Sequence, residues 1–188
     1  TFPYMAVGMR AYRLGYLYQA ADAAGMLTDD SRQILETALE EHRAELADDA
    51  KIVFHNNHGY YQIAGQLALG RRFAERSDAM RALYQQGLER FARILDMQFS
   101  AEDVHREHSP DYHRMVLNTL QGIVRSGLIA DEDLRQRALA IEEALAWFIL
   151  PSGQLANFGD SDSRSVLSSA QVARERWDTP LMRGAATC

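Results

Sequence analysis

The chain has 188 residues, of which 47% are hydrophobic, and a formal net charge of -6. This length and composition suit one globular domain with a substantial core, whereas the acidic balance and the lack of a polybasic tract argue against nucleic acid as the main partner. The sequence contains no apolar run long enough for a transmembrane segment, and no signal peptide opens it. The only cysteine, Cys188, leaves no internal disulfide and no cysteine-based zinc site.

The first half of the chain begins with two stretches of helical periodicity. Residues 4–24 are apolar on most sides, which predicts a buried helix, and Gly25 suits a left-handed helix stop. Residues 30–47 carry a single apolar stripe, with acidic residues on the opposite side. Thr28 or Asp30 is placed to cap this second helix.

The next two stretches repeat this alternation. Residues 60–73 are again apolar nearly all round, whereas 78–98 form a long helix with one apolar face. Strongly buried segments thus alternate with one-faced segments. This alternation suits two concentric layers of antiparallel helices, although an irregular helical bundle is an equally good interpretation of the periodicity alone.

The second half of the chain is also predicted to be helical. Ser109 followed by Pro110 is a strong helix start, because a capping hydroxyl precedes a proline in the first turn. Asp131 is placed to cap the next helix, which Pro151 ends. A polar loop rich in turn residues follows, and a last short helix is expected near 164–176. No clear strand pattern occurs, so the predicted fold class is all-α.

Two polar clusters hold five of the six histidines, and each lies just before a predicted helix. The first cluster is His55-Asn56-Asn57-His58, and the second is Glu107-His108-Ser109-Pro110-Asp111-Tyr112-His113, with His105 close by. A helix N-terminus carries unpaired N–H groups and the positive end of the helix dipole, which together favour an anion. A substrate that bears a carboxylate is therefore the first hypothesis, and helix caps with scattered surface histidines are the alternative.

Asn57, His58 and Tyr112 could together perform proton chemistry. An amide and an imidazole can neutralise a substrate carboxylate, which acidifies the neighbouring C–H. Tyr112, as the third residue of its helix, could then remove or relay that proton. This is the chemistry of β-elimination from a uronic acid, in which the C5 proton leaves and the C4–oxygen bond breaks.

Other interpretations of the same residues stay open. Asn57 could be a simple helix cap, and Tyr112 could pack against its own helix with its hydroxyl in water. Glu107 with Asp111 or Asp160 could form the acid pair of a glycoside hydrolase. Histidines three residues apart could ligate a metal. However, no aspartate or glutamate falls within the first set, and Pro110 interrupts the second before a helix could align it, so we expect no metal. A carbohydrate-binding helical module without chemistry is the remaining alternative.

The motifs resemble one family, the heparinase II/III-like polysaccharide lyases, which include related alginate lyases. The resemblance rests on four segments, Asn56-Asn57-His58-Gly59, Glu107-His108-Ser109-Pro110-Asp111-Tyr112-His113, Pro151-Ser152-Gly153-Gln154 and Gly159-Asp160-Ser161-Asp162. It covers roughly residues 50–165 by motif. The resemblance implies an incomplete (α/α) toroid of antiparallel helical hairpins over residues 1–188. Both ends of the sequence look cut, and the family's C-terminal β-sandwich domain would follow in a longer parent protein.

The resemblance also implies roles and surroundings. Tyr112 would be the catalytic base or acid, and Asn57 and His58 would neutralise the uronate carboxylate. The residues expected to bind substrate are Asn56, Glu107, His108 and His113, and the arginines near the clusters that could contact sugar carboxylates are Arg71, Arg72, Arg106 and Arg114. The implied partner is an anionic polysaccharide or oligosaccharide, met in the periplasm or outside the cell. No cofactor is expected in this part, although the missing domain holds a structural zinc in some members, and the fragment alone is expected to be inactive.

Overall fold

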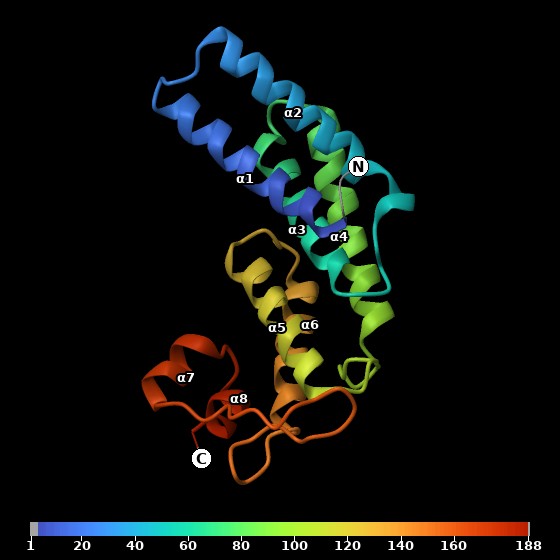
Figure 1. The fold of residues 1–188 in the computed structure, drawn as a ribbon, viewed down its shortest axis with the longest axis vertical. Coiled ribbons are helices and arrows are strands. Elements are labelled where there is room, and N and C mark those ends of the chain that lie inside the picture. The colour runs from blue at the N-terminus through green and yellow to red at the C-terminus, as the bar shows by residue number, and fades with distance from the viewer. Residues whose placement is uncertain (1–3, 188) are drawn as a thin grey trace. The chain divides into compact units, whose positions relative to one another are not determined.

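The structure is a computed structural model and describes residues 4–187, with the side chain of Tyr4 left out (Figure 1). Thr1, Phe2, Pro3 and Cys188, on which the expectations of cut ends and of a lone cysteine rest, lie outside the described residues. The described part consists of helices, turns and three isolated β-bridges, and it contains no strand. The all-α prediction is therefore confirmed. The chain divides into two compact units, one up to Leu95 and one from Asp96 onward.

The first unit contains four α-helices and a short 3-10 helix: α1 (Tyr4–Ala23), α2 (Asp29–Ala47), η1 (Asp49–Lys51), α3 (His58–Phe73) and α4 (Asp78–Gln98), whose last turn extends beyond the unit. Gly25, with a φ of 64°, follows the end of α1, as the sequence predicts. Thr28 caps α2, because its hydroxyl oxygen accepts a hydrogen bond from the Ser31 N–H at 3.2 Å.

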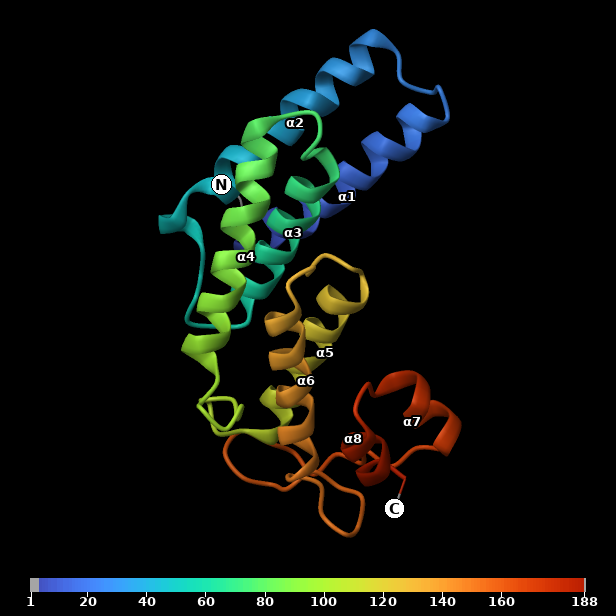
Figure 2. The same ribbon diagram turned by 180° about the vertical axis from the view of Figure 1, so that it is seen from behind.

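Helices α1 and α3 run parallel to each other and touch through glycines. A Cβ atom added to Gly65 of α3 would lie 2.2 Å from the Gly8 carbonyl oxygen of α1. Further along both helices, a Cβ atom added to Gly15 of α1 would meet Leu69 of α3 at 3.8 Å. Both contacts advance along the chain in the same direction, so the two helices form a layer of parallel neighbours, which lie alongside each other in both views (Figure 1 and Figure 2).

Helices α2 and α4 form the second layer. The buried Arg90 of α4 donates hydrogen bonds to the carbonyl oxygens of Leu46 and Ala47, where α2 ends. Nearer the start of both helices, Leu39 and Met80 line the same cavity. Each helix of this layer is antiparallel to the one that precedes it in the chain. The first unit is therefore two layers of helices, whereas the concentric arrangement that the sequence suggests stays a prediction.

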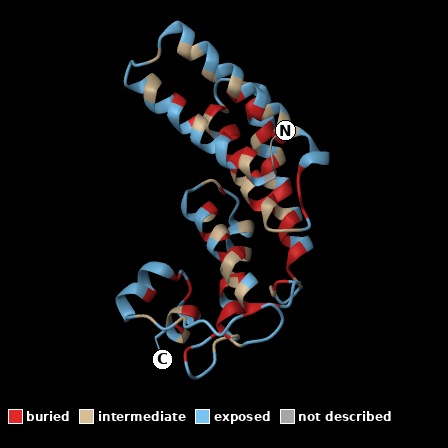
Figure 3. Ribbon diagram, viewed as in Figure 1, coloured by how far each residue is buried: buried red, intermediate tan, exposed pale blue. Residues whose placement is uncertain are grey.

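Helices α3 and α1 differ in how far they are buried (Figure 3). Helix α3 is buried along most of its length, which agrees with its apolar sequence. The expectation that α1 is buried on most sides is wrong, because five of its large apolar side chains are exposed: Met5, Met9, Tyr12, Tyr16 and Leu17. The layer contact uses small residues of α1, so these larger side chains are not needed for packing against α3.

The second unit contains α5 (Pro110–Arg125), α6 (Glu132–Ala146), α7 (Ala170–Arg176) and α8 (Pro180–Ala185). The predicted caps are confirmed, since Ser109 accepts from the Tyr112 N–H and Asp131 from the Leu134 N–H. The last predicted helix begins later than expected, at Ala170. Helix α8 was missed, although Thr179 and Pro180 form the same start signal as the one that predicts α5.

A buried carboxylate holds the C-terminal segment of the second unit. Glu142 of α6 is completely buried, and its Oε1 accepts hydrogen bonds from the N–H groups of Asp178 and Thr179 at 2.8 and 2.7 Å and from the Thr179 hydroxyl at 2.9 Å. Its Oε2 accepts from the Gln121 amide at 2.5 Å. Four donors therefore compensate the loss of hydration of this carboxylate, and they fix the start of α8.

Replacing Glu142 with glutamine is expected to lower the free energy of unfolding of the second unit by about 2 kcal/mol. The glutamine amide has only one acceptor oxygen, so at least one of the four buried donors must face an N–H₂ group instead. Urea denaturation followed by circular dichroism measures the change. Glu143→Gln is the matched control, since this neighbouring carboxylate is exposed. Equal midpoints for the two variants would contradict the anchoring role.

Candidate functional site

The first polar cluster lies at the start of α3. His58 is the first residue of that helix, and the Asn56 Oδ1 accepts a hydrogen bond from the His58 N–H at 2.9 Å. Asn57 occupies the N-cap position, but its side chain makes no capping hydrogen bond. The capping role considered for Asn57 is therefore taken by Asn56. Asn56, Asn57 and His58 are half-buried, and His55 is exposed.

The chain before this cluster is held against α3 by two residues. The buried Gln62 accepts a hydrogen bond from the Val53 N–H at 2.9 Å and donates one to the Lys51 carbonyl oxygen at 2.8 Å. Gly59 permits the close approach, because a Cβ atom there would lie 2.2 Å from the Val53 carbonyl oxygen. These contacts fix the backbone on both sides of Asn57, so the cluster has a rigid support.

The second polar cluster lies at the start of α5 and is joined to the later loop motif. The hydroxyls of Ser109 and Ser161 share a hydrogen bond of 2.8 Å, and the Ser161 Oγ also accepts from the Asp111 N–H at 3.0 Å. The Ser109 Oγ in turn accepts from the Tyr112 N–H at 3.3 Å. Ser161, which the sequence placed in a turn-rich loop, is thus a buried part of the helix start.

Gly159 brings the same loop close to the polar cluster. It has a φ of 59°, and a Cβ atom there would lie 2.5 Å from the His108 carbonyl oxygen. His108 itself has a φ of 53°, an unusual conformation for a residue other than glycine. Two motifs that are some 50 residues apart, 107–113 and 159–162, are therefore neighbours in the second unit.

Two arginines bind the carboxylate of Asp111. Arg164 donates to its Oδ2 at 2.6 Å, and Arg114 donates to its Oδ1 at 3.0 Å. Partial burial alone would raise the pKa of this carboxyl, but the hydrogen bonds from Arg114 and Arg164 lower the pKa below its usual value. A general acid needs a raised pKa, so the surroundings of Asp111 weigh against its use as the acid of a glycoside hydrolase.

Two histidines lie beneath the start of α5 and hold its backbone. The Nδ1 of His113 accepts a hydrogen bond from the His105 N–H at 3.4 Å, and its Nε2 donates to the Ile141 carbonyl oxygen at 2.8 Å. The Nδ1 of His105 accepts from the Glu107 N–H at 3.4 Å, while its Nε2 faces the Gln98 side-chain oxygen at 3.4 Å. Because a backbone N–H can only donate, each Nδ1 must be unprotonated.

Burial agrees with the uncharged state of both imidazoles. His113 is only 1% exposed and His105 only 2%. Loss of hydration lowers the pKa of each imidazole to about 4. The sequence analysis expected His113 to contact substrate, whereas the structure places it below the surface, with both ring nitrogens bound to the backbone. Its position is that of a support for the loop.

Three of the predicted site residues of this cluster do reach the surface. Tyr112 is 36% exposed, and Glu107 and His108 are also exposed. Of these three, only His108 lines a mostly apolar cavity of 170 Å³. The lining comes from the loop, the start of α5 and two aromatic rings: Val104, His105, His108, Ser109, Pro110, His113, Phe148 and Phe158. Phe158 was not singled out from the sequence, although an aromatic residue in a turn-rich loop is a feature that can indicate a site.

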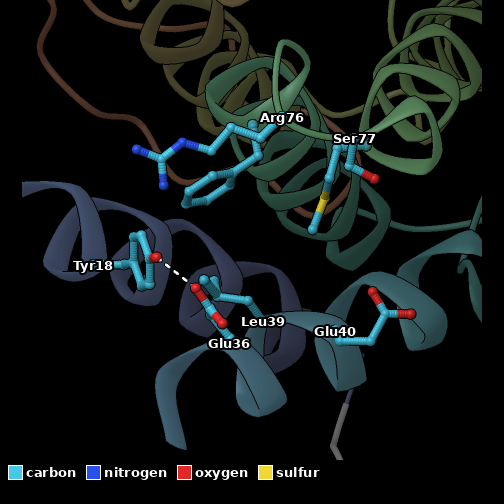
Figure 4. A pocket seen from close by; sticks show the side chains of 8 residues that line it. Tyr18, Glu36, Leu39, Glu40, Arg76 and Ser77 are labelled. Atoms are coloured by element: carbon cyan, nitrogen blue, oxygen red, sulfur yellow. Dashed lines mark hydrogen bonds between the residues drawn. The ribbon is translucent and has the colours of Figure 1, made fainter. Parts of the chain in front are cut away.

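A second cavity, of 210 Å³, lies in the first unit away from both clusters (Figure 4). The Tyr18 hydroxyl donates to Glu36 at 2.7 Å, and Arg76 lies over the Tyr18 ring at 5.6 Å. Arg76 also pairs with Asp22 at 3.1 Å. The polar groups around this cavity are thus engaged with one another, which favours a role in holding α1 against α2.

The predicted catalytic residues belong to different units. Asn57 and His58 lie in the first unit, and Tyr112 lies in the second. Their convergence on one substrate therefore stays a prediction. Within residues 5–187, no group of three or more histidine, cysteine, aspartate or glutamate side chains is placed to hold a metal ion. None of the described helices is both long enough and apolar enough to cross a membrane.

The chain was compared with protein-family models, with curated proteins and with solved structures. None of them matches it. The resemblance to the heparinase II/III-like lyases therefore stays a prediction from the four motif segments.

Proposed function

We propose that the chain is the helical part of a polysaccharide lyase that cleaves uronic-acid-containing glycans by β-elimination. The observation that carries this proposal is the junction of two motif segments at Ser109 and Ser161, which holds Tyr112 at the exposed start of α5. The two-layered first unit is compatible with a further proposal, that the helices belong to an incomplete (α/α) toroid. A periplasmic or extracellular location and a C-terminal β-sandwich domain are parts of the same proposal.

The proposed reaction divides the work among three side chains. The Asn57 amide and the His58 imidazole hold the uronate carboxylate and stabilise the negative charge that develops next to it. Tyr112 removes the C5 proton, the electron pair left on C5 forms the C4–C5 double bond, and the C4–oxygen bond breaks. The departing oxygen takes up a proton, which Tyr112 can return. The products are one fragment with a new reducing end and one fragment whose non-reducing end is an unsaturated uronate.

Two local features favour Tyr112 for this role. Its backbone N–H is held by the Ser109 cap, so the residue lies in the first turn of α5, at the positive end of the helix dipole. The two neutral histidines beneath it fix the loop before the helix without adding charge. The neighbouring carboxylate of Asp111 is engaged by two arginines and does not compete for the proton.

Replacing Tyr112 with phenylalanine in the full-length protein is expected to lower the rate of formation of unsaturated product by about 10²–10⁴-fold, because the proton acceptor is lost. The ultraviolet absorbance of the new double bond measures this rate. Tyr60→Phe is the matched control, since the Tyr60 ring is buried and its hydroxyl has no hydrogen-bond partner among the described residues. Turnover retained by the Tyr112 variant would contradict the assignment of Tyr112 as the proton acceptor.

The same assay separates the lyase from the alternative enzyme class. A glycoside hydrolase that uses Glu107 with Asp111 or Asp160 would release reducing ends without an unsaturated sugar. A carbohydrate-binding module without chemistry would release neither product.

A further inference from the structure

A row of apolar and aromatic side chains is exposed along α1. We name it the aromatic stripe, and it consists of Met5, Met9, Tyr12 and Tyr16. Their spacing of four, three and four residues places them on one side of the helix. Tyr12 is 49% exposed and Tyr16 is 60% exposed. The side of α1 that contacts α2 is nearly opposite, since it carries Tyr18, which bonds to Glu36.

An arginine of α3 extends the aromatic stripe across the layer. The Arg72 guanidinium lies 5.6 Å from the centre of the Tyr16 ring and donates a hydrogen bond to the Gln19 side-chain oxygen at 2.5 Å. Within the described part of the chain, no carboxylate pairs with Arg72. An aromatic ring, a guanidinium and an amide are thus assembled at one exposed place, and no carboxylate of residues 5–187 neutralises the charge of the guanidinium.

Charge is distributed unevenly between the two layers of the first unit. Helices α1 and α3 together contain four arginines and one aspartate, whereas α2 and α4 together contain nine acidic residues and five arginines. That aspartate, Asp22, pairs with Arg32 and Arg76. Among the described residues, the exposed Arg13 and Arg71 have no carboxylate partner. The α1–α3 layer is therefore locally positive in a chain whose net charge is -6.

We propose that the aromatic stripe, together with Arg72 and Gln19, binds a stretch of anionic polysaccharide. The Tyr12 and Tyr16 rings offer flat apolar surfaces for the C–H faces of sugar rings. Arg72 offers a planar donor pair for a carboxylate. The choice of a uronate polymer rests on the proposed function, but binding at this surface requires no chemistry at Tyr112.

Charge complementarity favours this ligand over a second copy of the chain. A twofold contact through the aromatic stripe would place the same patch of both copies face to face. The arginines without carboxylate partners in one copy would then repel those of the other copy. An anionic polymer meets the same arginines with opposite charge.

The test measures the affinity of the 188-residue chain for polymannuronate by isothermal titration calorimetry, with neutral dextran as the comparison polymer. We expect the double variant Tyr12→Ala/Tyr16→Ala to raise the dissociation constant at least about tenfold, and Arg72→Gln to raise it by a similar factor. The double variant Tyr12→Phe/Tyr16→Phe keeps the rings and should bind nearly as the parent does. Ile34→Ala and Arg81→Gln are matched controls on α2 and α4, and they should leave the affinity unchanged.

Three results would overturn the proposal. They are unchanged affinity in the alanine and glutamine variants, equal binding of dextran, and conversion of a dimer to a monomer by the alanine variants without loss of polymer affinity. Circular dichroism confirms that each variant is folded. Tyr112→Phe separates this proposal from the lyase, because it should lose product formation in the full-length protein and keep polymer binding in the chain.

Discussion

Replacing Gly65 with alanine is expected to destabilise the first unit by about 2–4 kcal/mol. The added Cβ would lie 2.2 Å from the Gly8 carbonyl oxygen and 2.4 Å from the Gly8 Cα. Backbone atoms cannot turn away as a flexible side chain can, so α1 and α3 must move apart. That movement opens the contact along the whole layer, and the gain in helix propensity from alanine offsets only about 1 kcal/mol of the cost.

Gly122→Ala provides the opposite sign with the same chemistry. Gly122 lies within α5, and a Cβ atom added there meets no atom within 4 Å. Alanine restricts the unfolded chain and favours the helix, so this variant should be more stable by roughly 0.5–1 kcal/mol. Thermal unfolding followed by circular dichroism measures both changes. An unfolding temperature unaltered by Gly65→Ala would show that the two helices do not approach so closely.

Acid is expected to destabilise the second unit through its two buried histidines. His105 and His113 have folded-state pKa values of about 4, below the ordinary value near 6.5 that applies to the unfolded chain. Between these two pH values the unfolded chain binds more protons than the folded one. The contribution of the two histidines to the free energy of unfolding is therefore fully present above about pH 6.5. It is lost as the pH is lowered toward 4, by about 3 kcal/mol for each histidine.

The structural reason for the loss is the direction of the hydrogen bonds. A proton on either Nδ1 would face a backbone N–H, which has no lone pair to offer. Asp111 does not contribute in this window, because its arginine partners lower its pKa, and its stabilising effect is lost only below the ordinary carboxyl range. His108 adds a nearby charge when it is protonated, which disfavours the charged form of His105.

Urea unfolding measured between pH 4 and 7.5 tests this expectation. His113→Gln is the informative variant, because a glutamine amide can donate to the Ile141 carbonyl oxygen and accept from the His105 N–H without titrating. The variant should show a shallower dependence of unfolding free energy on pH than the parent chain. The same slope in both proteins would remove His113 from the explanation.

Local patterns in the sequence were sufficient for most of the long helices of this chain. Capping residues and apolar periodicity placed α2 and α4 within a residue or two of their observed bounds and identified Ser109 as a helix start. They located α1 but gave its burial wrongly, because apolar periodicity reports which side chains are hydrophobic and not whether another element covers them. Helix α8 was missed because only six residues follow its start signal, too few for a periodic pattern.

The candidate site was only partly accessible from sequence. The two polar clusters could be found as helix starts, but the pairing of Ser109 with Ser161 joins residues 52 positions apart. The burial of His113 could not be predicted either, since a histidine next to a tyrosine at a helix start has the same sequence signature whether it faces solvent or the core. Only the packing of α5 against α6 distinguishes these positions.

The bond between Ser109 and Ser161 also bears on the order in which the protein is made. During synthesis the start of α5 leaves the ribosome long before Ser161 does, so this turn must wait for the whole of α6 and most of the following loop. Until then Tyr112 has its helical cap but lacks the contact that fixes the cap itself. A chain released early would therefore carry every residue of the second polar cluster without its finished geometry.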